Sequence, residues 1–130
     1  MNLTRERNID LYTSFCRVRK GLGRYACHMS RKSLAQFVVE GKARKFYITP
    51  ETALKLINLV EAGKLKDRKG SLAHSRAIDL YRKFREIVGE KPGISRYSAA
   101  DLVVNAEAPR FYIDWDSALR IITKYERGIQ

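Results

Sequence analysis

Apolar side chains recur at helical spacing in several stretches of the sequence. In the second half, Ala77, Tyr81, Phe84 and Val88 share one stripe, with Leu80 and Ile87 beside it. This i, i+3/i+4 spacing is that of one face of an α-helix packed against a core. Stripes of the same kind occur over residues 9–16, 53–60 and 118–125. The pattern therefore predicts a mainly α protein.

The two halves of the sequence repeat one another. Residues 7–12 match residues 76–81 at an offset of 69, whereas residues 30–35 and 43–48 match residues 95–100 and 108–113 at an offset of 65. The first copy thus holds four extra residues after its first helix. The repeat predicts two tandem, pseudo-symmetric modules of three to four helices each, residues 1–63 and 73–130. Residues 64–72, basic and with one Gly and one Ser, are predicted to be a linker.

Capping signals suggest where the helices begin and end. A side-chain oxygen before a helix accepts a backbone N–H that has no partner within the helix. Proline favours the first helical position, and glycine favours the exit. The expected starts are Ser75 for the first helix of the second copy, Ser33 and Ser98 for the second helices, and Thr49-Pro50 and Asp114 for the third. The expected ends are Gly89, Gly41 and Asn105.

The segment between the second and third helices leaves two structures open. Phe46-Tyr47-Ile48 and Phe111-Tyr112-Ile113 consist of residues that favour strands, and the two segments could pair with one another. Alternatively, Pro109 starts a short helix, which is the structure that we favour. In that case residues 33–49 and 98–114 each form a helix-turn-helix-like unit, which resembles the unit of repressor-type helix-turn-helix proteins.

The charge of the chain points towards a polyanionic partner. The 130 residues carry 26 Lys and Arg against 14 Asp and Glu, a formal net charge of +12. Such an excess attracts phosphate-bearing ligands and raises association rates. A membrane surface is not expected as a partner, because no predicted helix combines a Lys/Arg face with a large exposed apolar face. The alternative that stays open is a charge that serves only solubility. No run of apolar residues is long enough to span a membrane.

The charge is concentrated in the first copy. Residues 1–63 have a net charge of +7, residues 64–72 of +3, and residues 73–130 of +2. Because both copies share one pattern of apolar residues, folding does not require the extra cations of the first copy. Loops and helix ends carry them, where long side chains can reach phosphates. The predicted nucleic-acid-binding residues are Arg17, Arg19, Lys20, Arg24, Arg31, Lys32, Lys42, Arg44, Lys45, Tyr47, Arg96 and Arg110.

Sites for other chemistry find little support in the sequence. Gly21 and Gly23 lack the Gly-Lys-Ser/Thr ending of a phosphate-binding loop. Cys16, Cys27, His28 and His74 fit no zinc spacing, and free thiols suit a reducing intracellular site. No catalytic constellation emerges, so we expect neither an enzyme nor a metal or other cofactor.

These observations lead to a functional hypothesis. We expect a non-enzymatic nucleic-acid-binding accessory or regulatory protein, with DNA a better ligand than RNA, and a cytoplasmic, nucleoid-associated or virion-associated location. The second module would serve in packing, dimerisation or docking of a protein partner. The alternative is a protein–protein adaptor, or a structural component of a phage or mobile element, that works close to nucleic acid.

Overall fold

A computed structural model describes residues 2–128 of the chain. These residues form the α-helices α1 (Leu3–Leu22), α2 (Arg31–Glu40), α3 (Pro50–Glu61), α4 (Leu72–Glu90), α5 (Arg96–Val104) and α6 (Trp115–Glu126). A 3-10 helix, η1 (Gly23–His28), follows α1. Within residues 2–128 there is no β-strand beyond one isolated bridge. The prediction of a mainly α protein is confirmed.

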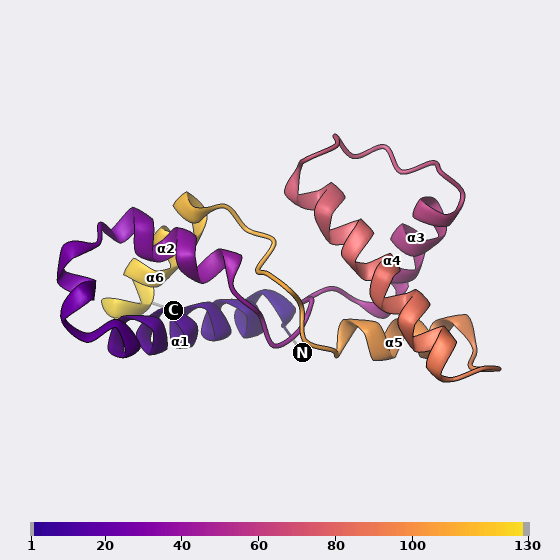
Figure 1. Cartoon of the computed structure of the whole chain (residues 1–130), viewed down its shortest axis with the longest axis horizontal. Coiled ribbons are helices and arrows are strands. Elements are labelled where there is room, and N and C mark those ends of the chain that lie inside the picture. The colour runs from indigo at the N-terminus through magenta and orange to yellow at the C-terminus, as the bar shows by residue number, and fades with distance from the viewer. Residues whose placement is uncertain (1, 129–130) are drawn as a thin grey trace. The chain divides into compact units, whose positions relative to one another are not determined.

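The helices form two compact units, and each unit contains helices from both copies of the sequence repeat. Unit 1 consists of Met1–Ala43 and Ala108–Gln130 and contains α1, η1, α2 and α6. Unit 2 consists of Arg44–Glu107 and contains α3, α4 and α5 (Figure 1). The third helix of each repeat therefore packs on the first two helices of the other repeat. The compact units thus differ from the modules 1–63 and 73–130 that the repeat suggested.

Each unit has a core of equivalent residues. In unit 1, Leu11 and Phe15 of α1 and Ile122 of α6 are buried. In unit 2, the equivalent residues Leu80 and Phe84 of α4 and Ile57 of α3 are buried. Burial of such side chains is the main source of the stability of a folded unit. The third helix that each unit takes from the other repeat is therefore an integral part of its core.

The Phe-Tyr-Ile segments are neither helix nor strand, which corrects both expectations. Phe46 and Ile48 are buried while Tyr47 between them is half-buried, and residues 111–113 repeat this alternation. Residues two apart share a face in an extended backbone but not in a helix. The alternation excludes a helix, and the path is irregular, with Tyr47 at a φ of 55° between the two buried side chains. Because the short helix after α2 or α5 is absent from the described residues, no helix-turn-helix unit forms there.

Backbone hydrogen bonds hold the segments through which the chain passes from one unit to the other, and each of these bonds lies within a single unit. The Ala43 N–H donates to the Ala108 carbonyl at 3.0 Å, and the Ala108 N–H donates back at 2.9 Å. Farther along, the Phe46 N–H donates to Val104 in unit 2, and the Phe111 N–H donates to Val39 in unit 1. Val39 and Val104 lie at the ends of α2 and α5, where carbonyls lack helical partners. These bonds use the backbone groups that a helix or a strand pair would have needed.

The capping residues agree with the sequence in part. Thr49 and Asp114 cap α3 and α6, and Gly41 and Asn105 end α2 and α5, as predicted. The second helices begin three residues earlier than expected, because Ser30 and Ser95 accept the N–H groups of Ser33 and Ser98. Likewise, α4 is capped by Ser71 and not by Ser75, and it runs one residue past Gly89. Leu72 accordingly belongs to α4, and the connector comprises residues 64–71.

Candidate nucleic-acid interface

Three of the predicted nucleic-acid-binding arginines form ion pairs within the chain. Arg31 of α2 binds Glu126 of α6 at 2.5 Å, and Arg19 reaches the same carboxylate at 3.4 Å. In unit 2, Arg96 of α5 binds Glu61 of α3 at 2.7 Å. Arg31 is equivalent to Arg96, and Glu126 to Glu61, so each arginine holds the third helix of the other repeat.

The same arginines also lie over aromatic rings. The guanidinium groups of Arg19 and Arg31 lie 5.2 and 5.9 Å from the Phe15 ring centroid, and that of Arg96 lies 5.0 Å from Phe84. Lys32 lies 4.8 Å from the ring of Trp115. Cation–π contacts of this kind favour the observed side-chain positions. Arg19, Arg31, Lys32 and Arg96 therefore serve packing, which weakens their assignment to the binding site.

The ion pair at Glu126 predicts a pH-dependent stability. Hydrogen bonding from Arg31 lowers the pKa of Glu126 below its ordinary value. A carboxyl whose pKa is lower in the folded state stabilises above its unfolded-state pKa, and this contribution is lost as pH falls through the folded-state pKa. We expect Glu126→Gln to lower the free energy of unfolding by less than about 1 kcal/mol at pH 7, because the pair is partly exposed. The difference from the parent should narrow as the pH falls below the ordinary glutamate pKa, as urea unfolding at a series of pH values from 7 downwards would show; an equal loss at every pH would contradict the assignment.

A second group of cations is exposed and has no acidic partner among residues 2–128. Two of them, Lys20 and Arg24, lie at the end of α1 and in η1. Beside them, Arg17 is exposed and donates to the buried Ser14 at 3.2 Å. Four more lie in the connector: Lys64, Lys66, Arg68 and Lys69. The sequence identified these positions as basic, but only the structure separates them from the paired arginines.

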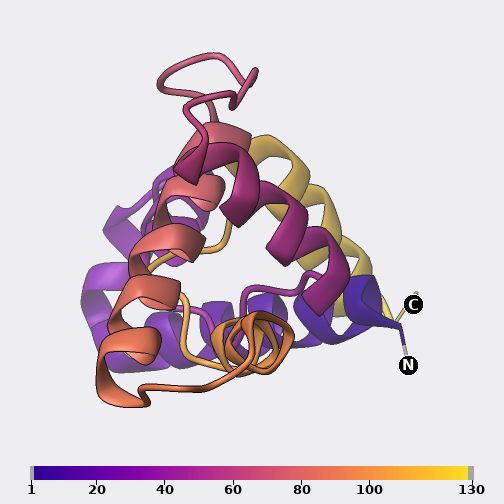
Figure 2. The ribbon, with the colours of Figure 1, turned by 90° about the vertical axis from the view of Figure 1, so that its right-hand side faces the viewer.

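The connector forms an open loop between α3 and α4 (Figures 1 and 2). Backbone hydrogen bonds hold both ends: Lys64 donates to Leu59 at 2.9 Å, and Ser71 donates to Arg68 at 2.9 Å. Gly63 and Gly70 have φ values of 68° and 90°, which glycine adopts without strain. Apart from half-buried Leu65 and Ser71, the loop is exposed. Its cations are thus displayed on a backbone that is tied at its two ends.

The remaining predicted binding residues are less available. Lys45, Tyr47 and Arg110 are half-buried, whereas Lys42 and Arg44 are exposed. Lys42, Arg44, Lys45 and Tyr47 each interact with another group of the chain. These residues lie on or beside the segments that cross between the units. Their structural role accounts for part of the pattern that the sequence suggested was functional.

Charge is more evenly distributed between the compact units than between the repeats. Unit 1 contains 13 basic and 6 acidic residues, a net charge of +7. Unit 2 contains 13 basic and 8 acidic residues, a net charge of +5, and it includes the connector. The exchange of third helices and the position of the connector reduce the asymmetry seen along the sequence. Both units consequently present candidate phosphate-binding cations.

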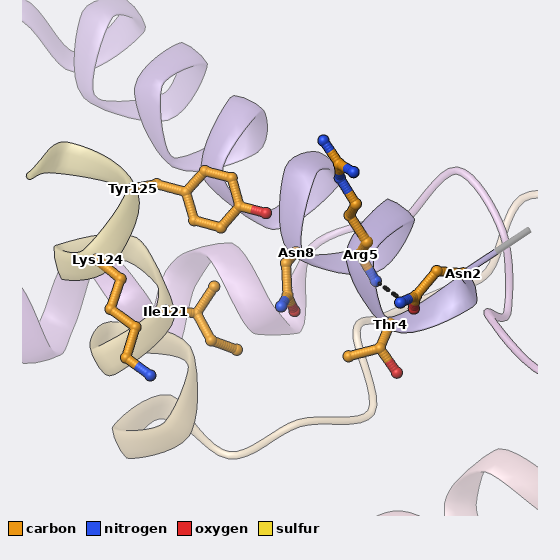
Figure 3. A pocket seen from close by; sticks show the side chains of 7 residues that line it. All are labelled: Asn2, Thr4, Arg5, Asn8, Ile121, Lys124 and Tyr125. Carbon is orange, nitrogen blue, oxygen red and sulfur yellow. Dashed lines mark hydrogen bonds between the residues drawn. The ribbon is translucent and has the colours of Figure 1, made fainter. Parts of the chain in front are cut away.

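Unit 1 also contains a shallow pocket of about 440 Å³ between the start of α1 and the end of α6 (Figure 3). It is lined by Asn2, Thr4, Arg5, Asn8, Ile121, Lys124 and Tyr125. Asn2 caps α1 by accepting the Arg5 N–H at 3.0 Å. Figure 3 shows Arg5 and Lys124 extending to opposite sides of the pocket. Because the two cations do not converge on one point, we do not assign an anion site here.

The described residues were compared with what a metal site and a membrane-spanning helix require. Both cysteines are free, with Cys16 half-buried and Cys27 exposed. Within residues 2–128, no three His, Cys, Asp or Glu side chains are grouped as a metal ion would need. In the same part of the chain, no helix combines the length and the apolar character required to cross a bilayer.

Comparison with protein-family models, curated proteins and solved structures gives no match for this chain.

Proposed function

We propose that the protein is a non-enzymatic nucleic-acid-binding accessory or regulatory protein that binds DNA mainly through phosphate contacts. The observation that carries this proposal is the set of exposed cations without an acidic partner among the described residues. The strongest members are Lys20 at the end of α1, Arg24 in η1, and Lys64, Lys66, Arg68 and Lys69 in the connector.

The way acids are used supports this selection. Glu126 binds Arg19 and Arg31, and Glu61 binds Arg96. Several others are also engaged: Asp79 with Arg82, Glu86 with Lys83, Asp116 with Arg120, and Asp114 as a helix cap. Among the described residues no ion pair joins a connector cation to an acid, Asp67 of the connector included, so these cations are left for an outside anion. Phosphate is the anion that a row of cations on a loop would meet in a nucleic acid.

The connector provides the first test. We expect Lys66→Gln, Arg68→Gln and Lys69→Gln together to weaken binding of duplex DNA. For every phosphate that the variant no longer neutralises, the slope of log affinity against log salt should fall by about 0.9. Fluorescence anisotropy with duplex DNA, single-stranded DNA and structured RNA at several salt concentrations measures both quantities and ranks the ligands.

A matched control removes three cations that have acidic partners. The variant Arg82→Gln, Lys83→Gln and Arg120→Gln changes the net charge by the same amount at positions paired with Asp79, Glu86 and Asp116. It should keep most of the affinity and of the salt slope. Equal losses in both variants would show that only net charge matters, and would contradict the assignment to the connector.

One observation favours the alternative of a protein–protein adaptor. Phe37 of α2 and Leu102 of α5 occupy equivalent positions and are 56% and 41% exposed. Large apolar side chains that are exposed at equivalent positions of the two repeats are typical of a surface that binds another protein. If the unchanged protein binds none of the three nucleic acids at low salt, the adaptor becomes the better hypothesis.

A further inference from the structure

The η1 segment is an addition that the fold does not require. It contains the four extra residues of the first repeat, and none of its six residues is buried. In unit 2, α4 is joined to α5 by the short segment 91–95 alone. The same kind of three-helix unit therefore forms without η1. A segment that adds no core is better explained by contact with a ligand than by stability.

Tyr25 within η1 is displayed to an unusual degree. Its side chain is 75% exposed, more than that of any other large apolar or aromatic residue described. It has no hydrogen-bond or ring partner among residues 2–128. A solvent-exposed aromatic ring exposes apolar surface to water, and a planar base can cover that surface by stacking.

The second repeat offers an internal comparison. Tyr97 also follows an arginine and is 50% exposed. However, its hydroxyl donates to Glu51 at 3.0 Å, and the neighbouring Arg96 binds Glu61. Tyr97 and Arg96 are thus held by α3, whereas Tyr25 and Arg24 have no such partners in the described chain. Of these two Arg-Tyr pairs, Arg24-Tyr25 of η1 is the pair that is available to an outside ligand.

We propose that η1 binds unpaired nucleotides, with Tyr25 stacking on a base while Arg24 and Lys20 contact the adjoining phosphates. This inference rests on the proposed nucleic-acid binding and names the form of nucleic acid that this segment recognises. An unpaired base exposes both faces to an aromatic ring, whereas a base inside a duplex is already stacked on its neighbours. Cations beside such a ring are the usual combination in proteins that bind single strands.

The test is Tyr25→Ala, measured with a single-stranded oligonucleotide and with a fully paired duplex. We expect a loss of affinity of about fivefold to a hundredfold for the single strand, and less than about twofold for the duplex. Tyr25→Phe should retain binding, because the ring and not the hydroxyl stacks. Since Tyr25 is so exposed, its replacement should leave the unfolding transition unchanged.

Tyr97→Ala is the matched control and should leave single-strand affinity within about twofold of the parent. A second readout uses Tyr25→Trp in a chain carrying Trp115→Phe, in which addition of oligothymidine should quench the single tryptophan. Equal losses for single strand and duplex, or no loss for either, would overturn the role of η1. If the connector variant still weakens binding, only this inference fails; if the unchanged protein binds no nucleic acid, the proposed function fails with it.

Discussion

A chain that ends at Glu107 is expected to keep unit 2 folded and to lose the structure of unit 1. Residues 44–107 contain all three helices of unit 2, so this unit is complete without residues 108–130. Unit 1 would lack α6, whose Ala118 and Ile122 are fully buried in its core. Its α1 and α2 cannot borrow α3, because α3 is already packed in unit 2.

Amide hydrogen exchange distinguishes this expectation from its opposite. Protection should persist in α3, α4 and α5 of the shortened chain and disappear in α1 and α2. Residues 44–107 alone should give the same pattern of protection. Two independent tandem modules would behave the other way: removal of residues 108–130 would disrupt residues 73–107 and spare residues 1–63. That outcome would refute the exchanged arrangement.

Phe15→Ala is expected to destabilise unit 1 by about 3–5 kcal/mol, the usual cost of removing a buried phenylalanine ring. Phe15 is 1% exposed. Its ring also lies beneath the guanidinium groups of Arg19 and Arg31, which bind Glu126 of α6. The substitution therefore leaves a cavity and removes a surface that helps to position the contacts to α6. Urea unfolding followed by residue-resolved NMR would assign the loss to unit 1.

Phe37→Ala provides the control, because the same change is made at a side chain that is 56% exposed. Its effect should stay within about 0.5 kcal/mol. Similar losses for Phe15→Ala and Phe37→Ala would show that the core of unit 1 is wrongly assigned.

The sequence predicted the helices well, because apolar spacing and capping are local properties. Thr49-Pro50 and Asp114 start helices in the structure as they do in the pattern. Apolar spacing and capping did not predict that the third helix of each repeat packs on the first two helices of the other repeat. Ile57 and Ile122 are equivalent residues within the same apolar pattern, so this pattern does not show which repeat each of them packs against. Apolar periodicity shows that a helix face is buried but does not show which copy buries it.

The binding site was predictable only in part. The sequence located the basic stretches, including the connector, but charge alone did not separate paired cations from free ones. The sequence did contain a signal for the pairing. Arg31 and Arg96 are at equivalent positions of the two copies, and so are Glu61 and Glu126. Charges kept in both copies belong to the fold, whereas Lys20, Arg24 and Tyr25 lie in or beside a segment that one copy lacks.

The division of the chain also governs the order in which its parts can be completed on the ribosome. Unit 2 is encoded by one continuous stretch, so all its helices have been synthesised once residue 107 has emerged. Unit 1 begins first and finishes last, because α1 and α2 must wait for α6. During that interval, the apolar surfaces around Leu11 and Phe15 lack their final cover. The amino-terminal part of this protein thus matures after the middle, the reverse of the usual order for successive domains.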